Sequence, residues 1–295
     1  MKILLTGGSG FIGSELKKVL ESAGHQCYNA DLKNSFNIKY LITFIYLFEK
    51  YDVDIVIHLA AQTLLRESIK DPLEDAWTNI IGSLNLLEAC AEKGIKKVLY
   101  TSTGGARYGI QEESISESCT PKPISPYGIS KHTVEHYLDF YNREYGITFI
   151  CLCLSNVIGE SDPIDNGRIV TQIIHKILDE EEIVIYGDGG QKRDYIHVDD
   201  VVKIISLIIE KDIFDNTIYN ISSGESVSVL DIISKVEKQL NKKAILKYEP
   251  FKKSELKEVA LDNSRIINRL NLKITPFDKS LFRTVKRIER IRGIK

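Results

Sequence analysis

The sequence MKILLTGGSGFIG at residues 1–13 decides the fold. An apolar strand pattern at residues 3–6 runs directly into a series of glycines, and a helical pattern follows at once. Glycines permit a tight turn and let the backbone approach a pyrophosphate, while the free N–H groups at the start of the helix bind its negative charge. We therefore predict a dinucleotide-binding turn formed by Gly7, Gly10, Phe11, Ile12 and Gly13.

A carboxylate follows the second predicted strand. Asp31 comes directly after residues 27–30, at the edge of the sheet where the adenosine ribose of a dinucleotide binds. Its oxygens can accept hydrogen bonds from the ribose hydroxyls and repel a 2′-phosphate, which favours NAD over NADP as the cofactor. Two alternatives remain: Asp31 is only a solvated turn residue, or the nearby Lys33 offsets its charge.

Short apolar strands alternate with helical patterns through the first half of the chain. Strands are predicted at residues 3–6, 27–30, 55–59, 98–101 and 149–154, with helices at residues 11–23, 72–92 and 126–145. Such alternation is typical of α/β proteins with a doubly wound parallel sheet, the Rossmann arrangement. Beyond residue 155 the elements become shorter, including strands at residues 183–186 and 219–221 and a helix at residues 229–240.

These patterns predict two domains. We expect an NAD-binding Rossmann domain at residues 1–155 and a smaller α/β substrate domain at residues 156–295, with some interleaving of segments. The longest apolar stretch, residues 41–48, is far shorter than the roughly 20 residues that a membrane-spanning helix needs, and it indicates a buried helix.

Composition gives no reason to expect nucleic acid or an anionic membrane as a partner. The 295 residues are 43% hydrophobic and 27% charged, and acidic and basic residues nearly cancel to a formal net charge of −2. The basic residues 283–295 alternate with apolar ones at helical spacing, which suits a helix with one solvated basic face.

Cysteine and histidine usage points to a reducing compartment and to no metal. The five cysteines are odd in number, form no CxxC pair and lie mostly in apolar runs. No signal-peptide pattern is present at residues 1–13, so we expect a cytoplasmic protein. The six histidines show no metal-ligand spacing, and His197 is interpreted as a hydrogen-bonded structural residue.

A tyrosine and a lysine stand one helical turn apart. The sequence YGISK places Tyr127 and Lys131 on the same face of a helix that Ser-Pro begins. A tyrosine with its ordinary pKa of about 10 is a poor base, but a nearby cation lowers that pKa by roughly 1–3 units. Thr101, Ser102 and Thr103 stand where the strand predicted from residue 98 ends, at the sheet edge where ligands bind. Together these groups form a candidate proton-transfer site, although the spacing alone also fits a surface coincidence.

These residues lie in a series of motifs that resembles one known family. The motifs are TGGSGFIGSEL at residues 6–16, HLAAQ at 58–62, DPLEDAWTNIIGSLNLLEAC at 71–90, TSTGGARYG at 101–109, SPYGISK at 125–131, LSNVIGE at 154–160 and YGDGGQKRDYIHVDDV at 186–201. In kind and order they resemble the extended short-chain dehydrogenase/reductases, within them the NAD-dependent sugar-nucleotide epimerases and dehydratases, and most of all the UDP-glucose 4-epimerases. The resemblance runs along nearly the whole chain and implies NAD as the cofactor.

The resemblance also implies roles for single residues. Tyr127 becomes the catalytic acid/base and Lys131 the residue that holds the nicotinamide ribose. The residues implied to line the NAD site are Leu59, Ala60, Ala61 and Asn79, and those that match contacts to the diphosphate or the base of the sugar nucleotide are Asn156, Tyr186 and Arg193. For Arg193 the alternative is a surface salt bridge to Asp194.

Two positions depart from the family pattern, and a third bears on substrate specificity. Gly104 stands where a hydroxyl is expected, so the catalytic and substrate-binding hydroxyl is assigned to Thr103, with Ser102 as a competitor. Lys252 replaces a phosphate-binding arginine, which keeps the charge but loses the bidentate geometry. Val259 matches a position that borders the sugar pocket and is smaller than the tyrosine of more restrictive relatives, which predicts that N-acetyl sugars are admitted.

The predicted reaction is removal of hydride from carbon 4 of a UDP-hexose and its return to the opposite face. A 4,6-dehydratase is disfavoured, because its relatives place Asp-Glu directly after the catalytic threonine, where this chain has Gly104 and Gly105. Reductases and decarboxylases of the family remain alternatives, as does a non-catalytic protein that senses NAD. Helices near residues 80–91 and 133–141 carry apolar residues on a second face, and relatives pair these helices, so we expect a homodimer.

Overall fold

The chain folds into two compact units, each assembled from three segments. The structure is a computed structural model and describes residues 1–109, 114–162, 168–250 and 258–294. The first unit contains Met1–Gly109, Glu117–Leu154 and Val201–Asn220; the second contains Ile110–Ser116, Ser155–Asp200 and Ile221–Lys295. The chain thus leaves the first unit after Leu154 and later returns to it.

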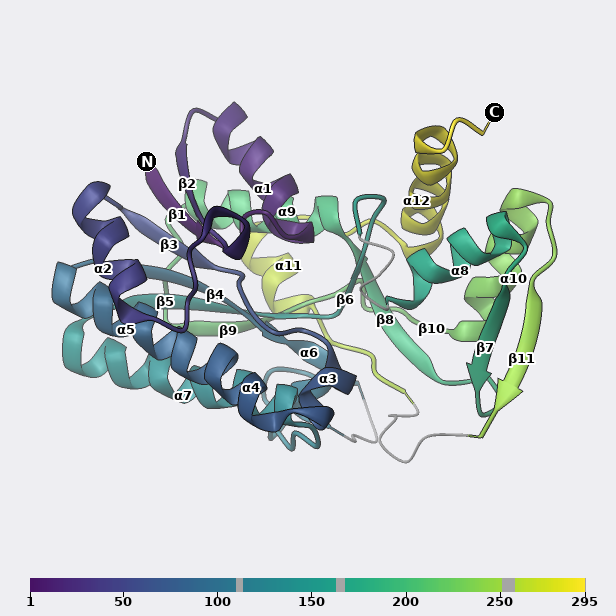
Figure 1. The fold of residues 1–295 in the computed structure, drawn as a ribbon, viewed down its shortest axis with the longest axis horizontal. Coiled ribbons are helices and arrows are strands. Elements are labelled where there is room, and N and C mark those ends of the chain that lie inside the picture. Colours follow the sequence, from purple (N-terminus) through teal and green to yellow (C-terminus); the bar gives the residue numbers. More distant parts are fainter. Residues whose placement is uncertain (110–113, 163–167, 251–257, 295) are drawn as a thin grey trace. The chain divides into compact units, whose positions relative to one another are not determined.

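A six-stranded sheet with strand order β2-β1-β3-β4-β5-β9 forms the centre of the first unit (Figure 1). Its strands are β1 (Lys2–Thr6), β2 (Gln26–Ala30), β3 (Ile55–His58), β4 (Lys97–Thr103), β5 (Thr148–Leu154) and β9 (Thr217–Ile221). The pairs from β2 through β5 are parallel, which confirms the predicted doubly wound sheet. The strand expected at residues 219–221 among the later elements is β9, and it lies at the edge of this sheet instead.

Helices cover both faces of that sheet. They are α1 (Phe11–Ser22), α2 (Leu41–Lys50), α3 (Leu65–Lys70), α4 (Pro72–Ala76), α5 (Gly82–Lys93), α6 (Gly104–Tyr108), α7 (Pro126–Tyr145) and α9 (Val198–Glu210). Figure 1 shows α1 and α9 on one face and α2, α5 and α7 on the other. Alternate strand residues such as Leu4, Val56 and Val98 share a buried core with these last three helices.

Two helices differ from their predicted form. The helix expected at residues 72–92 consists of α4, a π-helical turn at Trp77–Ile81, and α5. The helix expected to be buried at residues 41–48 is α2, but only one face of it is covered: Phe44 and Leu47 are buried, whereas Ile42 is 70% exposed. No helix among the described residues combines the length and apolar character needed to cross a membrane.

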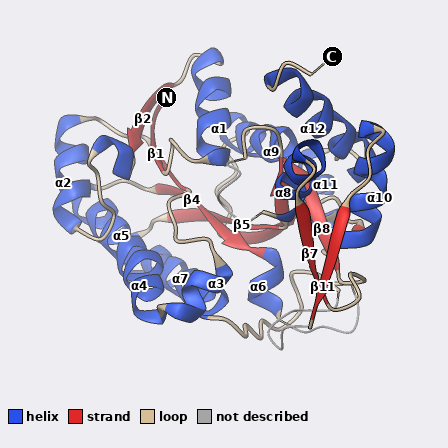
Figure 2. Cartoon of the chain, turned by 45° about the vertical axis from the view of Figure 1, so that its right-hand side comes forward, coloured by secondary structure: helices blue, strands red, loops and turns tan. Residues whose placement is uncertain are grey.

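The second unit holds two small sheets and its own core. One sheet has the order β10-β8-β6, and the other pairs β7 with β11. The strands are β6 (Asn156–Ile158), β7 (Glu182–Tyr186), β8 (Lys192–His197), β10 (Ser226–Ser228) and β11 (Ile245–Glu249), and the helices are α8 (Ile169–Asp179), α10 (Val229–Leu240), α11 (Ser264–Leu270) and α12 (Phe277–Ile291). Figure 2 shows the strands β7, β8 and β11 of this unit in red. Apolar side chains of α8, α10 and α12 form its core.

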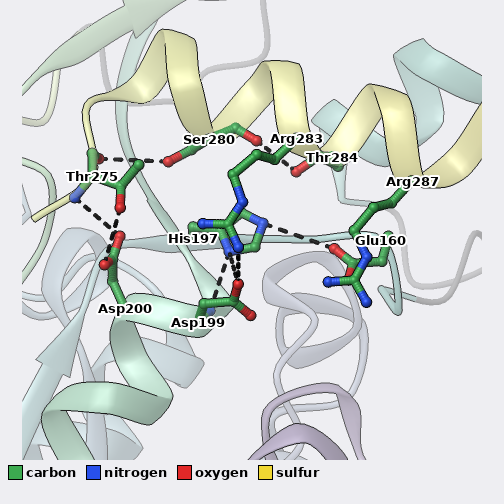
Figure 3. A network of polar contacts seen from close by, with 9 residues as sticks. All are labelled: Glu160, His197, Asp199, Asp200, Thr275, Ser280, Arg283, Thr284 and Arg287. Atoms are coloured by element: carbon green, nitrogen blue, oxygen red, sulfur yellow. Dashed lines mark hydrogen bonds and ion pairs between the residues drawn. The ribbon is translucent and has the colours of Figure 1, made fainter.

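The C-terminal helix α12 is fixed by polar contacts within the second unit (Figure 3). The contacts join Arg283 with Asp199, Arg287 with Glu160 at 2.5 Å, and the Thr275 N–H with Asp200 at 3.1 Å. His197 lies at the centre of this group, fully buried, and its Nδ1 accepts the Asp199 N–H at 3.2 Å. The basic helix predicted near the C-terminus is thus present, with Arg283 and Arg287 in ion pairs.

Candidate functional site

The turn between β1 and α1 has the geometry that a dinucleotide pyrophosphate requires. Gly7 adopts a φ of 70°, a left-handed conformation that favours glycine. A Cβ on Gly7 would lie 2.8 Å from Ala60 N, and a Cβ on Gly13 would lie 2.3 Å from the Gly7 carbonyl oxygen. Helix α1 begins at Phe11 with no side-chain cap, so its first turn offers N–H groups to a phosphate. The turn therefore fits a dinucleotide.

Asp31 lies directly after β2 and reaches back to this turn. Its Oδ2 accepts the Ser9 N–H and its Oδ1 accepts the Lys33 N–H, each at 3.0 Å. A carboxylate has roughly four lone-pair sites, so two of them remain available to ribose hydroxyls. The side chain is half-buried at the carboxyl end of a parallel strand, the position that a ribose-binding acid requires.

The segment after β3 carries the other predicted cofactor contacts. Leu59, Ala60 and Ala61 are half-buried, and the Ala60 N–H donates to Thr6 Oγ1 at 3.2 Å. Asn79 lies in the π-helical turn, where its Oδ1 accepts the Gln62 N–H at 2.8 Å and its Nδ2 donates to the Gln62 carbonyl at 3.0 Å. The buried Asn79 amide therefore fixes the end of this segment.

Helix α7 begins and ends as its sequence predicts. Ser125 caps it by accepting the Gly128 N–H, Pro126 is its first residue, and Gly146 ends it with a φ of 64°. Tyr127 is half-buried in its first turn, and the Tyr127 N–H donates to Ser68 Oγ at 3.2 Å. The serine from α3 thereby satisfies a helix-start N–H group that has no partner within the helix.

Lys131 lies one turn further along α7 and is only 3% exposed. Its Nζ lies 4.1 Å from the centroid of the Tyr100 ring in β4, a cation–π contact. Burial lowers the pKa of Lys131 to about 8. The ammonium is therefore held close to the sheet, beside the middle of β4.

The structure distinguishes the two candidate hydroxyls at the end of β4. Ser102 is 4% exposed, and its Oγ donates to Glu135 Oε1 at 2.6 Å, so it is committed to a contact inside the protein. Thr103 is the last residue of β4 and is half-buried. Since successive strand residues point to opposite faces, the side chain of Thr103 points away from Glu135. This geometry favours Thr103 over Ser102 as the reactive hydroxyl.

A buried ion pair joins α6 to α7 beside these residues. Arg107 Nε donates to Glu135 Oε2 at 2.7 Å and to Oε1 at 3.0 Å, and both side chains are at most 5% exposed. His132 Nδ1 lies 2.9 Å from Glu135 Oε2. Arg107, His132 and the Ser102 hydroxyl together keep the pKa of the Glu135 carboxyl below its ordinary value despite its burial.

Within the second unit, two predicted substrate contacts lie on neighbouring strands. Asn156 begins β6, and its Nδ2 donates at 3.0 Å to the carbonyl of Asp194 in β8, next to Arg193. Tyr186 ends β7 in the other sheet of the unit and is half-buried. The structure thus brings Asn156 and Arg193 together on one sheet.

Asp194, the alternative partner predicted for Arg193, makes hydrogen bonds to residues 223 and 224. The Asp194 carboxylate is fully buried and accepts the N–H groups of Ser223 and Gly224 at 2.9 and 3.1 Å. Val259 is buried at 2% exposure, and its N–H donates to the Lys192 carbonyl. Lys252 lies outside the described residues.

Several polar residues that hold this site lie outside the predicted set. Ser68, Gln62 and Asp75 were not singled out, although each contacts a predicted site residue or its helix. Asp75 stands one helical turn before Asn79 within the same motif, and this spacing is the signal that could have identified it.

Comparisons with known proteins agree with this geometry. A family model described as the NAD dependent epimerase/dehydratase family matches residues 3–222. A putative UDP-glucose 4-epimerase of Methanocaldococcus jannaschii is 34% identical over 275 residues, covering 88% of this chain and 89% of the relative. A dTDP-4-dehydro-6-deoxyglucose reductase of Escherichia coli is 29% identical over 293 residues, covering 92% of both.

Solved structures show the same fold. The crystal structure of a UDP-glucose 4-epimerase with UDP-glucose, from Thermotoga maritima, aligns with a TM-score of 0.94 at 34% identity, covering 99% of this chain and 100% of that one. With a family model that spans most of its length and a relative above 30% identity, this chain belongs to the NAD dependent epimerase/dehydratase family, and NAD is its cofactor.

Proposed function

We propose that this protein is a 4-epimerase of UDP-linked hexoses. The observation that carries the proposal is the junction between β4 and α6. Thr103 is followed directly by Gly104–Tyr108, a helix that contains no carboxylate and whose one ionisable cation, Arg107, is engaged with Glu135. An elimination reaction needs a general acid beside the reacting carbons, and α6 offers none, whereas Tyr127 and Lys131 suffice for reversible oxidation of an alcohol.

The residues of the first unit would act on the hydroxyl at carbon 4. Bound NAD supplies the acceptor for the hydride. Tyr127 takes the hydroxyl proton and later returns it, Thr103 hydrogen-bonds the same oxygen, and the nearby Lys131 ammonium favours the ionised phenol. Because burial holds the Lys131 pKa near 8, this charge is present at neutral pH.

The second unit would bind the UDP part of the substrate. Arg193 and Asn156 offer a guanidinium and an amide to the diphosphate, and Tyr186 offers a ring to the base. The similarity to proteins named UDP-glucose 4-epimerase supports UDP as the nucleotide. Val259 supports a pocket that admits N-acetyl sugars; conversion of UDP-glucose with complete rejection of UDP-N-acetylglucosamine would contradict that assignment.

The deciding experiment measures the sugar products and the reduced cofactor together. The purified protein with NAD is incubated with UDP-glucose, UDP-N-acetylglucosamine and UDP-glucuronic acid, and the products are separated by chromatography while absorbance follows reduced nicotinamide. A 4-epimerase converts substrate with no net build-up of reduced cofactor. Stoichiometric turnover of the cofactor would favour a reductase, which the similarity to the Escherichia coli reductase makes the second candidate.

We also propose that the protein is a homodimer in the cytoplasm. Ile129, Tyr137 and Phe140 are exposed on α7, where Tyr137 and Phe140 line a shallow hollow of about 390 Å³. Pairing of two copies through α5 and α7 would cover these apolar side chains. Five free thiols suit a reducing compartment. Sedimentation that shows only monomer at micromolar concentration would contradict the dimer, and Phe140→Lys should weaken it.

A further inference from the structure

A buried carboxylate lies beside the catalytic helix, and the proposed mechanism does not use it. Asp75 in α4 is 1% exposed. Its Oδ1 accepts hydrogen bonds from Gln62 Nε2 at 3.2 Å and from Asn79 Nδ2 at 3.0 Å, while its Oδ2 is buried and makes no hydrogen bond within the described residues. Burial raises the pKa of this carboxyl. A buried charge is costly unless another charge compensates it, so the position of Asp75 requires an explanation.

Lys131 is a buried cation that likewise needs a compensating charge. Its ammonium is almost fully buried, and no carboxylate oxygen of the described residues lies within the 4.0 Å of a salt bridge. The ionisable groups that act on Lys131, or on the Tyr100 ring that it contacts, come from five elements: His58 of β3, Asp75 of α4, Tyr100 of β4, Tyr127 and Glu135 of α7, and Cys151 and Cys153 of β5. One or more of these groups must balance the ammonium charge.

Most of these groups cannot act as the counter-charge. Glu135 also raises the pKa of Lys131, but it is bound to the Arg107 guanidinium through both carboxylate oxygens, so the charge of Arg107 offsets its own. Burial lowers the pKa of His58 to about 3 and raises the pKa of Tyr100 and of Cys151, which keeps all three neutral. Cys153 is a wholly buried thiol, and Tyr127 is the residue on which the ammonium is proposed to act. Asp75 is the anion that remains.

The hydrogen bonds of Asp75 lead to the same helix. Asn79 Nδ2, which donates to Asp75, also lies 3.3 Å from Ser130 Oγ, and Ser130 Oγ donates to the Tyr127 carbonyl at 3.0 Å. On its other side Asp75 binds the Gln62 amide, directly after the cofactor-binding residues 59–61. Asp75 is thus placed between the cofactor segment and the turn of α7 that carries both catalytic side chains.

We propose that Asp75 is a positioning residue of this site: its carboxylate orients the Gln62 and Asn79 amides and supplies the negative charge that balances the Lys131 ammonium. The inference rests on the proposed function, because it assigns Asp75 its purpose through Tyr127 and Lys131. It differs from a merely structural role in one respect: neutralising Asp75 must change the protonation of Lys131.

The test compares Asp75→Asn with Glu74→Gln in the NAD-loaded protein. Both variants remove one negative charge from α4, but Glu74 is half-exposed and pairs with Lys39. The titration of Lys131 is followed by NMR of ¹³Cε-labelled lysine, with Lys131→Met used to assign its signal. In Asp75→Asn the midpoint should fall by roughly 0.5–1 pH unit, and in Glu74→Gln it should stay as in the wild type. An unchanged midpoint in Asp75→Asn overturns the proposal.

A second measurement covers the case in which Asp75→Asn does not fold. Coupling between two groups is reciprocal, so the ¹³Cγ signal of Asp75 should titrate at higher pH in Lys131→Met than in the wild type. An unchanged Asp75 titration, or an Asp75 that stays protonated up to pH 8 in the wild type, overturns the proposal. Neither readout uses a sugar substrate, so failure of the epimerase assay with a shifted Lys131 titration would refute the proposed function alone.

Discussion

Replacing Arg107 with Met tests how much of the stability of the first unit depends on its buried ion pair. Methionine keeps most of the apolar stem of arginine but removes the guanidinium. Glu135 would then remain at 3% exposure with the Ser102 hydroxyl and His132 as its polar partners, and without the strong cation that now contacts both of its oxygens. An uncompensated carboxylate inside the sheet–helix core is the expected source of the loss.

The magnitude follows from this burial. Removing one partner of a buried pair typically costs about 3–5 kcal/mol, and the two remaining polar partners place this case near the lower end. For units of this size such a loss lowers the melting temperature by about 6–12 °C, since each kcal/mol shifts it by roughly 2–4 °C. Replacing both residues, with Arg107→Met and Glu135→Gln, should recover most of the loss, because the double variant leaves no buried charge unpaired.

Thermal unfolding of the NAD-free protein measures the effect, with Lys70→Met as the matched control. Lys70 pairs with Glu67 on the surface of α3, and its side chain is 69% exposed. Losing such a pair costs about 1 kcal/mol or less, so the control should melt close to the wild type. If Arg107→Met melts with the control, or if the double variant is as unstable as the sum of its single variants, the reasoning about this pair is wrong.

Three further predictions address chemistry, cofactor and pH. Tyr127→Phe keeps the ring but removes the hydroxyl, so turnover should fall by about 10²–10⁴-fold. NAD binding, measured through the fluorescence of the single tryptophan, Trp77, should persist. Unimpaired turnover would contradict the site assignment. Asp31→Asn should narrow the preference for NAD over NADP, because it removes the charge that repels a 2′-phosphate; tighter binding of NADP by the wild type would refute this. Burial lowers the pKa of His58 to about 3, so its contribution to stability is complete above a pH of about 6.5 and is lost as pH falls toward 3. Between pH 7 and 4 the melting temperature of His58→Gln should therefore fall less steeply than that of the wild type, and parallel slopes would contradict the assignment.

Local signals in the sequence were sufficient to predict the helix and the turn that carry the candidate site residues. Helix α7 was predicted with its observed ends, because Ser125 and Pro126 are strong start signals and the helical pattern continues to Tyr145. The glycine turn was also predictable from sequence, since a Cβ at Gly7, Gly10 or Gly13 would come too close to backbone atoms. Residues 219–221 were grouped with the later elements although β9 joins the first sheet, because a short apolar run contains no information on which sheet it joins.

The sequence left Ser102 as a competitor of Thr103 for a related reason. Both hydroxyls end the same strand, and their difference lies in a partner, Glu135, that is 33 residues from Ser102 along the chain. Alternation along a strand says that the two side chains point to opposite faces, but it does not say which face holds the buried carboxylate. Only the packing of α7 against β4 settles that, by engaging one hydroxyl and leaving the other at the strand end.

The sequence also does not show which acidic residues are buried or which have a cationic partner. In the sequence, Asp75 and Glu135 are two acidic residues on amphipathic helices, and each is most simply interpreted as solvated. In the structure both are buried on the same side of the sheet as Lys131, yet one is neutralised by Arg107 and the other is not. The field at Lys131 therefore depends on Arg107, which acts through Glu135. Motif residues alone therefore do not show which of the two carboxylates has a cationic partner.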